Sequence, residues 1–231
     1  MASAEFDRHA KHYRDVHAEN IIVSGESPEY FADYKIRDFA DLVASMGRAG
    51  NGQFLDFGCG VGNSVSPFRK YFPEGRLITA DVSGESLRMV KGTYGNLVDA
   101  LLIENGTLQL DDKSIDGAFA NCVFHHIDFQ HHQSVLKELR RVLRPGAPLM
   151  VYEHNPLNPM TLRAVNTCPL DEHAVLIRAR VMRQRLSDSG FTAPRIAYRV
   201  FFPALLRRLR PLEQHLKWLP LGAQYYVVAR A

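Results

Sequence analysis

Residues 54–63 read Phe-Leu-Asp-Phe-Gly-Cys-Gly-Val-Gly-Asn, an apolar run that contains an aspartate and is followed by a glycine at every second position. The apolar part predicts a buried strand that ends close to Asp56. Glycines adopt a positive φ without strain and let main-chain N–H groups approach a ligand, and the helix expected next directs the positive end of its dipole to the same place. The stretch therefore predicts a nucleotide-binding turn between a strand and a helix.

The glycine spacing excludes two common nucleotide sites. A dinucleotide fingerprint needs Gly-x-Gly-x-x-Gly, and a phosphate loop ends in Gly-Lys-Ser/Thr; this stretch has neither. A glycine-rich turn is also common as a plain tight connection, so its function depends on the next elements of the chain.

A second strand with an acidic end comes about 20 residues later, which is the distance that a ribose contact needs. Residues 77–83 read Leu-Ile-Thr-Ala-Asp-Val-Ser. Asp81 could accept hydrogen bonds from both ribose hydroxyls, and Val82 could pack on an adenine face. Asp81 could instead cap the next helix, but Ser83 can fill that role equally well. We therefore interpret Asp81 as the ribose-binding residue.

Strands and helices alternate along the rest of the chain. Helices are expected at 64–72, 84–91, 130–143 and 175–189, and further strands at 101–103, 115–123, 147–153, 193–201 and 223–229. This alternation predicts an α/β fold with a doubly wound, mainly parallel sheet that binds its ligand at the carboxyl ends of the strands. Asp56, Asp81, Asn121 and Glu153 should then share one rim.

The combination of these features resembles class I S-adenosylmethionine-dependent methyltransferases, in which an acidic residue precedes Gly-x-Gly-x-Gly. Ile115-Asp116 and Leu143-Arg144-Pro145-Gly146 match later landmarks of that family. The resemblance covers roughly residues 52–231 and implies a seven-stranded Rossmann-like sheet with an antiparallel last strand, helices on both faces and an N-terminal helical lid. It also implies S-adenosyl-L-methionine as the cofactor and S-adenosyl-L-homocysteine as the product.

The resemblance carries a set of cofactor-binding residues onto this sequence. They are Asp56, Gly58, Cys59, Gly60, Asp81, Val82, Asn105, Gly106 and Asn121. The sequence departs from the family at Asn105-Gly106, where many relatives have Asp-Gly or Asp-Ala. The amide oxygen of Asn105 could still accept a hydrogen bond from the adenine amine, with Glu104 as a reserve.

Two regions are expected to form the acceptor side of the site. Residues 1–45 are interpreted as a helical arm or lid, and residues 46–231 as the Rossmann-like domain, with an insertion at about 154–174. Aromatic residues of the arm could stack on the acceptor or the sulfonium, or could serve as packing in a helix laid on the sheet. The predicted substrate-binding residues are Tyr13, Tyr30, Tyr34 and Asn155.

Histidines supply the candidates for a general base. Methyl transfer needs orientation, plus a base where the acceptor must lose a proton. His125 and His126 come after the fourth strand and His154 after the fifth, so we interpret them as the catalytic candidates, the adjacent pair first. Histidines at such junctions also often only bond to a backbone carbonyl. No helical His-x-x-x-His pair and no Asp-rich ligand set is present, so no metal is predicted.

Composition places the chain among soluble α/β proteins. It has 231 residues, of which 46% are hydrophobic, a formal net charge of +3 and three widely spaced cysteines, which favours reduced thiols in a cytoplasmic protein. Neither a run of 18 apolar residues nor a signal-peptide pattern is seen, so no transmembrane segment is expected. The oligomeric state cannot be predicted from the sequence.

Basic residues gather at the carboxyl end. Residues 195–231 contain seven Lys or Arg and one acid, Glu213. Within them, residues 203–218 carry leucines with arginines in between. This segment could contact an anionic lipid surface or a phosphorylated acceptor, but an amphipathic helix that covers the core is the favoured interpretation.

The sequence therefore predicts a methyltransferase that acts on oxygen or nitrogen of a small-molecule acceptor. An RNA or protein methyltransferase is the alternative enzyme, but aromatic-interleaved basic stretches are absent and no nucleic-acid partner is expected. The Asn-Pro-Pro-Tyr motif of enzymes that methylate nucleobase or glutamine amines is replaced by Asn121-Cys122-Val123-Phe124. A sensor or scaffold that binds S-adenosylmethionine without turnover is the third alternative.

Overall fold

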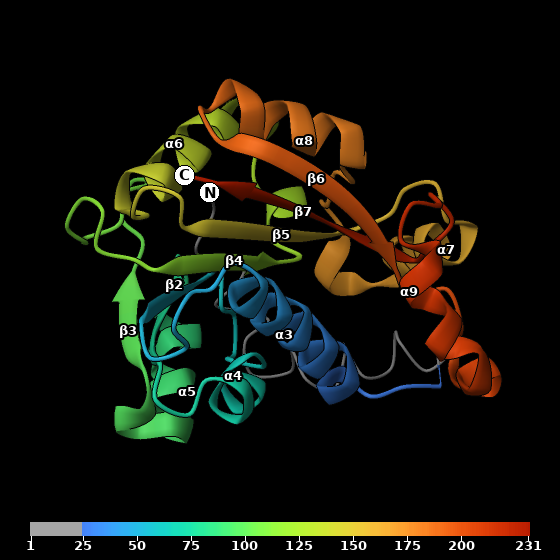
Figure 1. The fold of residues 1–231 in the computed structure, drawn as a ribbon, viewed down its shortest axis with the longest axis horizontal. Helices are drawn as coiled ribbons and strands as arrows, with labels where there is room; N and C mark the ends of the chain where they lie inside the picture. The colour runs from blue at the N-terminus through green and yellow to red at the C-terminus, as the bar shows by residue number, and fades with distance from the viewer. Residues whose placement is uncertain (1–24) are drawn as a thin grey trace.

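The computed structural model describes residues 25–231, which form a single sheet of strands with helices on both of its faces (Figure 1). The strand order is β3-β2-β1-β4-β5-β7-β6. The strands are β1 Gln53–Phe57, β2 Arg76–Asp81, β3 Asp99–Leu102, β4 Gly117–Asn121, β5 Pro148–His154, β6 Thr192–Arg199 and β7 Gln224–Arg230. Strands β1 to β5 pair in parallel, and β7 runs antiparallel to both β5 and β6. The predicted α/β class and the antiparallel last strand are confirmed.

Seven α-helices and five 3₁₀ segments connect the strands in the described part of the chain. The α-helices are α3 Pro28–Ser45, α4 Val65–Tyr71, α5 Gly84–Tyr94, α6 His132–Val142, α7 Pro159–Thr167, α8 Ala179–Asp188 and α9 Glu213–Leu216. The 3₁₀ segments are η3 Gly95–Leu97, η4 Phe124–His126, η5 Phe129–His131, η6 Pro169–Asp171 and η7 Ala204–Leu212.

The central strands are apolar on both faces because helices cover both of them. Side chains alternate along a strand, so Phe54 joins the core on the side of α3, α4 and α5, while Leu55 joins the core on the side of α6 and α8. Both side chains are fully buried. This explains why the sequence shows continuous apolar runs rather than alternation.

Helix α3 packs on the sheet as a core element. Ser27 caps it, Pro28 starts it, and Ile36 and Phe39 are fully buried. Tyr34 is also buried, and its hydroxyl donates to the Gln224 side chain on β7. The packing alternative was therefore the better one for Tyr34, and its predicted contact with the acceptor is corrected to a core role. Tyr13 and the rest of the arm before residue 25 lie outside the described residues.

A buried ion pair fixes α3 to the carboxyl-terminal strands. The Arg199 guanidinium donates to Asp38 from Nε at 2.7 Å and from Nη2 at 3.1 Å, and the Tyr152 hydroxyl donates to the same carboxylate. Both members of the pair are nearly inaccessible to water. One arginine of the basic segment is thus part of the core and is not available to a partner.

The segment between β6 and β7 does not cover the core. It forms η7 and the short helix α9, and η7 has no buried residue. Leu206 has non-helical dihedral angles, and Pro211 cannot donate a helical hydrogen bond, so the segment is kinked. The prediction of an amphipathic helix packed on the core is wrong here. Among residues 25–231, no helix is long and apolar enough to cross a membrane.

Candidate functional site

Four polar side chains meet at the edge where the parallel strands end. Asp56 lies near the end of β1, and Asp81, Asn121 and Glu153 lie at or next to the ends of β2, β4 and β5. Strands in parallel register bring their carboxyl ends to one edge, which is where doubly wound sheets bind ligands. The predicted rim is therefore formed.

The glycine turn is held against the end of β2. The N–H groups of Gly58 and Cys59 both donate to the Ala80 carbonyl, at 2.7 and 3.1 Å. The next N–H, that of Gly60, donates to Asp81 Oδ2 at 2.8 Å. Asp81 therefore fixes the turn, in addition to its predicted contact with a ribose.

Asp81 also organises the start of the following helix. Its Oδ1 accepts from the Ser83 N–H at 2.9 Å, while the Ser83 hydroxyl caps α5 by accepting from the Ser86 N–H. Each carboxylate oxygen can accept two hydrogen bonds, so acceptor capacity for ribose hydroxyls is compatible with these contacts.

Replacement of Gly58 by alanine is expected to destabilise the protein by about 2–4 kcal/mol, because a methyl group there combines backbone strain with overpacking. Gly58 has φ +72° and a Cβ added to it would lie 2.6 Å from Val123. The matched control is Gly60→Ala, where φ is +51° but nothing lies within 4 Å of the added atom. Its expected cost is about 1–2 kcal/mol. Urea unfolding of both variants measures the difference, and equal costs would contradict the predicted clash.

Asp56 is a buried acid with an unpaired oxygen. It is 1% exposed, and its Oδ2 has no hydrogen-bond partner in the described structure. Burial, assisted by the nearby charge of Asp81, raises the pKa of Asp56 to about 8. An unsatisfied buried acceptor next to the glycine turn fits a ligand that brings a cation, such as the ammonium group of S-adenosylmethionine.

The remaining predicted cofactor residues line the same edge. Asn105 and Gly106 both have positive φ in the exposed turn after β3, and Val82 is half-buried after β2. Asn121 Nδ2 donates to the Ser64 hydroxyl at 3.2 Å, which connects β4 to the entry of α4. Cys59 is buried within the turn. Their contacts with a cofactor stay predictions.

The two adjacent histidines differ in environment. His125 is buried between two carboxylates: its Nδ1 lies 2.5 Å from Glu153 Oε2, and its Nε2 lies 3.5 Å from Asp171 Oδ1. Glu153 is itself fixed by the N–H groups of Val123 and Phe124. Burial opposes the charged imidazole, but the two carboxylates outweigh it and raise the pKa of His125 to about 10. His125 is therefore a protonated, positioned group.

His126 is the accessible member of the pair. Its side chain is 21% exposed and its Nε2 lies 3.4 Å from Asp171 Oδ1. Burial, together with the charge of His125, lowers the pKa of His126 to about 4. A neutral imidazole always has one acceptor nitrogen, so His126 is able to take a proton at neutral pH. His154 lies beside the pair, with its ring centre 5.2 Å from that of His125.

Sequence reasoning missed Asp171, which η6 places against both histidines. The carboxylate belongs to the insertion between β5 and α8, and its partners lie more than forty positions earlier in the chain, so no local spacing indicates it. Desolvation opposes its charge, but the histidines lower the pKa of Asp171 to about 2.

The sequence predicted no metal, yet His125, His126 and Asp171 offer ligand atoms within 4.8 Å of one another.

The contact between Cys122 and Lys35 also has no local signal in the sequence. Cys122 comes directly after β4 with φ +60°, and the Lys35 ammonium of α3 lies 3.2 Å from its sulfur. Burial alone would raise the thiol pKa, but Lys35 and His154 lower it to about 6. Cys122 is thus expected to be largely a thiolate at neutral pH.

The rate at which iodoacetamide alkylates Cys122 should therefore rise with pH and reach its plateau above about pH 6–7 rather than above pH 9. Cys122 is partly exposed whereas Cys59 and Cys168 are buried, so mass spectrometry should find it modified first. In a Lys35→Met variant the profile should move to higher pH, because only burial and the weaker cations remain. An unchanged profile in that variant would remove Lys35 as the cause.

Two predicted acceptor contacts have other partners. Asn155 is 1% exposed; its Nδ2 donates to the carbonyls of Pro220 and Gly222, and its Oδ1 accepts from the Leu157 N–H. Asn155 therefore fixes the loop after β5 to the segment before β7. Its expected contact with the substrate is corrected to this structural role. Tyr30 is partly exposed, and the Arg210 guanidinium lies 4.6 Å from its ring centre.

Comparisons with known proteins agree with this geometry. A family model described as a methyltransferase domain matches residues 55–151, which run from β1 through the glycine turn to β5. A trans-aconitate 2-methyltransferase from Methylobacterium nodulans is 32% identical over 125 residues, 52% of this chain and 45% of the relative. A ribosomal RNA small subunit methyltransferase C from Pseudomonas aeruginosa is 26% identical over 179 residues, 73% of this chain and 53% of the relative. The chain spans about half the length of these curated relatives.

Solved structures share the fold over almost the whole chain. A SAM-dependent methyltransferase from Thermotoga maritima superimposes with a TM-score of 0.64 and 17% identity, and covers 98% of both chains. The matched domain contains the glycine turn, Asp81 and the histidine pair. Residues 55–151 therefore match a methyltransferase domain, and the chain has the fold of S-adenosylmethionine-dependent methyltransferases.

Proposed function

We propose that this protein transfers the methyl group of S-adenosylmethionine to an oxygen or nitrogen atom of a small-molecule acceptor. The observation that carries the proposal is the position of neutral, accessible His126 on the same sheet edge as the glycine turn and Asp81. The similarity to a trans-aconitate 2-methyltransferase supports an acceptor of small size.

The cofactor would be held by groups from three strand ends. Asp81 would take the ribose hydroxyls, the N–H groups of the glycine turn and Asp56 would take the methionine part, and Asn105 would take the adenine amine. Bound there, S-adenosylmethionine supplies a methyl group that its sulfonium already activates. The chain's own task is then to orient the acceptor and remove its proton.

His126 performs the proton transfer in this proposal. As the acceptor oxygen or nitrogen forms its bond to the methyl carbon, its proton moves to the imidazole of His126. Asp171, 3.4 Å from Nε2, stabilises the imidazolium that results. Protonated His125, held by Glu153, keeps Asp171 in place. His125 therefore acts as a positioning residue, and His126 is preferred as the base.

The test is a transfer assay with methyl-labelled S-adenosylmethionine and a panel of carboxylic acids, alcohols, phenols and amines. We expect label in at least one class, equal formation of S-adenosylhomocysteine, and no loss of activity after dialysis against EDTA, since two carboxylates hold His125 protonated. Activity lost with EDTA and restored by zinc would replace the base mechanism with a metal at His125, His126 and Asp171. Tight cofactor binding without transfer to any acceptor would support a sensor or scaffold instead.

Methylation of RNA is the second candidate, because the Pseudomonas aeruginosa relative is a ribosomal RNA methyltransferase and its similarity extends over 179 residues. The basic carboxyl-terminal segment is compatible with this candidate. Binding to RNA that weakens steeply with salt, together with transfer of label to RNA, would favour it over the small-molecule acceptor.

A further inference from the structure

An exposed apolar surface lies on the segment between β6 and β7. We define the apolar patch as six side chains: Leu205, Leu206, Leu209, Leu212, Trp218 and Leu221. Leu205 is 93% exposed and Trp218 is 74% exposed, and the other four are exposed to between 41% and 59%. Large apolar side chains that are exposed on one segment mark an interaction surface on a folded protein.

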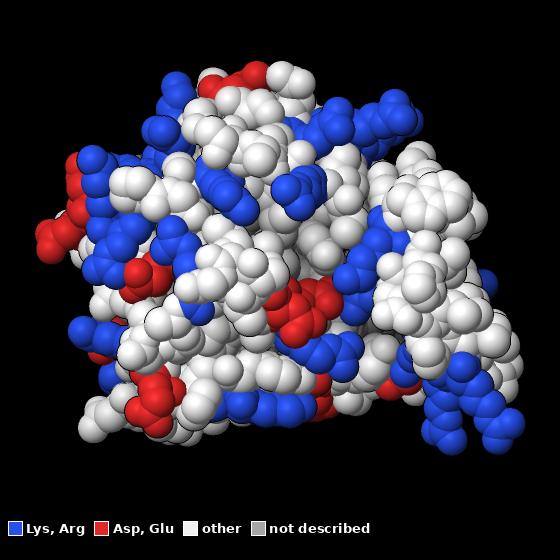
Figure 2. All heavy atoms as spheres, in the orientation of Figure 1, with Lys and Arg blue, Asp and Glu red and all other residues white. Residues whose placement is uncertain are grey.

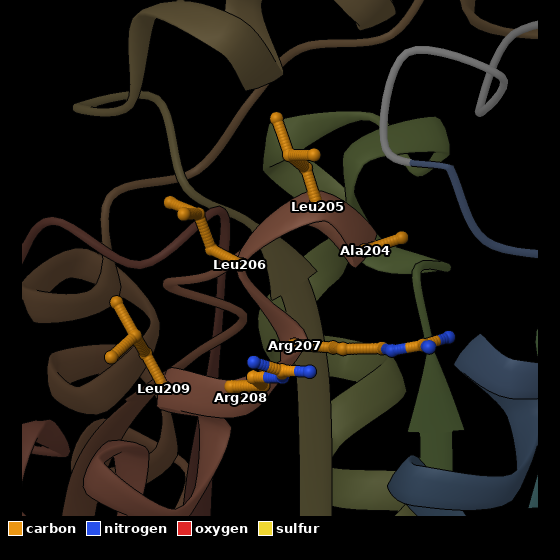
Figure 3. Close-up of a pocket in the computed structure, with 6 residues that line it drawn as sticks. All are labelled: Ala204, Leu205, Leu206, Arg207, Arg208 and Leu209. Carbon is orange, nitrogen blue, oxygen red and sulfur yellow. The ribbon is translucent and has the colours of Figure 1, made fainter.

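The segment turns its leucines away from its arginines. In Figure 3, Leu205, Leu206 and Leu209 point to one side of the ribbon and Arg207 and Arg208 to the other, around an open hollow of about 500 Å³. No residue of η7 is buried, so burial in this protein's own core does not account for the leucines.

Two exposed arginines lie on the same segment as the apolar patch. Arg207 and Arg208 are exposed, and within residues 25–231 no ion pair involves either of them. The one acid of the basic segment, Glu213, is buried and accepts from the N–H groups of Phe201 and Phe202. In Figure 2 the end of the molecule that carries α7 and α9 in Figure 1 is mostly uncharged, with basic side chains along its lower edge.

We propose that the apolar patch, with Arg207 and Arg208, is a docking surface for an anionic phospholipid bilayer. Leucine side chains would enter the boundary of the acyl chains and Trp218 would lie at the level of the headgroups. The two arginines, which extend away from the leucines in Figure 3, would attract the anionic surface through their charge without entering it. The charge complementarity selects this occupant. Arg207 and Arg208 form no ion pair among residues 25–231, and the one acid of residues 195–231 is turned inward. Glu26 beside the segment is paired with Arg210, so the surface fits an anionic membrane.

The apolar patch projects from the same sheet edge as the candidate site. In the sheet register, Gln224 at the start of β7 pairs with Arg199 at the end of β6 and with His154 at the end of β5. The patch connects β6 to β7 at this edge. Docking would thus hold the site close to the membrane surface, where an acceptor embedded in or bound to lipid would be found.

Trp218 provides the first test, because it is the only tryptophan of the chain. The full chain is mixed with vesicles of phosphatidylcholine alone or with about one third phosphatidylglycerol. We expect a blue shift of the emission and co-sedimentation with the anionic vesicles, both reduced by salt. No shift and no co-sedimentation at low salt would overturn the proposal. This binding is measured without turnover, so its outcome is separate from that of the transfer assay.

Variants separate charge and apolar contributions. Arg207→Glu/Arg208→Glu is expected to reduce vesicle partitioning at least about tenfold, whereas Arg180→Glu/Arg183→Glu, the same charge change on exposed positions of α8, should have a much smaller effect. Leu205→Ser/Leu209→Ser should also reduce partitioning, and Leu97→Ser, 55% exposed on η3, should not. Equal losses in test and control variants would overturn the proposal. A Trp218 shift that depends on protein concentration without vesicles would assign the patch to a second copy instead.

Discussion

Replacing Asp81 with alanine is expected to weaken binding of S-adenosylmethionine by at least about 2 kcal/mol, which is about thirtyfold in Kd. The carboxylate accepts from the N–H groups of Gly60 and Ser83, so its removal releases the glycine turn in addition to deleting the predicted ribose contact. Isothermal titration calorimetry with S-adenosylmethionine and S-adenosylhomocysteine measures the loss for both ligands.

Two further variants make this result specific. Asp99→Ala removes an exposed acid from the start of β3, where it pairs only with Arg76 among residues 25–231, and should leave Kd unchanged. Asp81→Asn keeps one acceptor oxygen, so its Kd should lie between those of the native protein and Asp81→Ala. If all three variants bind like the native chain while thermal unfolding shows them folded, the cofactor does not bind at this strand end.

Replacing His126 with asparagine is expected to lower kcat by about 10²- to 10⁴-fold, the usual contribution of a general base. The Kd for S-adenosylmethionine should be unchanged, because the proposed cofactor contacts come from other strand ends. His131→Asn is the matched control, since His131 is exposed at the start of α6 and is separated from the pair by the η4–η5 turn. Loss of activity in the control alone would contradict the assignment.

The pH profile of kcat/KM, which reports the pKa values of the free enzyme, gives an independent readout of the same residue. The active form of His126 is deprotonated, so activity should rise as pH increases through about 4, the pKa of His126. The active form of His125 is protonated, so activity should fall as pH increases through about 10, the pKa of His125. A plateau between about pH 5 and pH 9 is therefore expected from these two pKa values. An acidic limb near pH 6–7, the ordinary range of a histidine, that persists in His126→Asn would point to another base.

The cofactor side of the site was predictable because its information is local. A strand, a glycine turn and a second strand with an acidic end lie within thirty residues, and their chemistry depends on backbone geometry that glycine and aspartate impose nearly anywhere. The structure adds that Asp81 holds the turn itself, through Gly60. That contact depends on the pairing of β1 with β2, so neither motif taken alone predicts it.

The acceptor side was only partly predictable because its chemistry comes from distant pairs. The position of the histidines after the fourth strand was predicted, but their opposite protonation states depend on Glu153, 28 positions after His125, and on Asp171 in the insertion. The pair of Cys122 with Lys35 spans 87 positions. Such contacts appear only when the strand order is known.

The sequence by itself determined the order of strands and helices, the glycine turn and the acidic end of β2, because hydrophobic periodicity and turn chemistry act over a few residues. Only the tertiary structure decided which side chains of those elements face one another. It placed Tyr34 in the core, made His125 a cation and His126 a neutral imidazole, and turned the leucines of η7 outward. The physical reason is that burial and charge pairing depend on neighbours in space, and an apolar stripe in the sequence does not reveal whether protein or another surface will cover it.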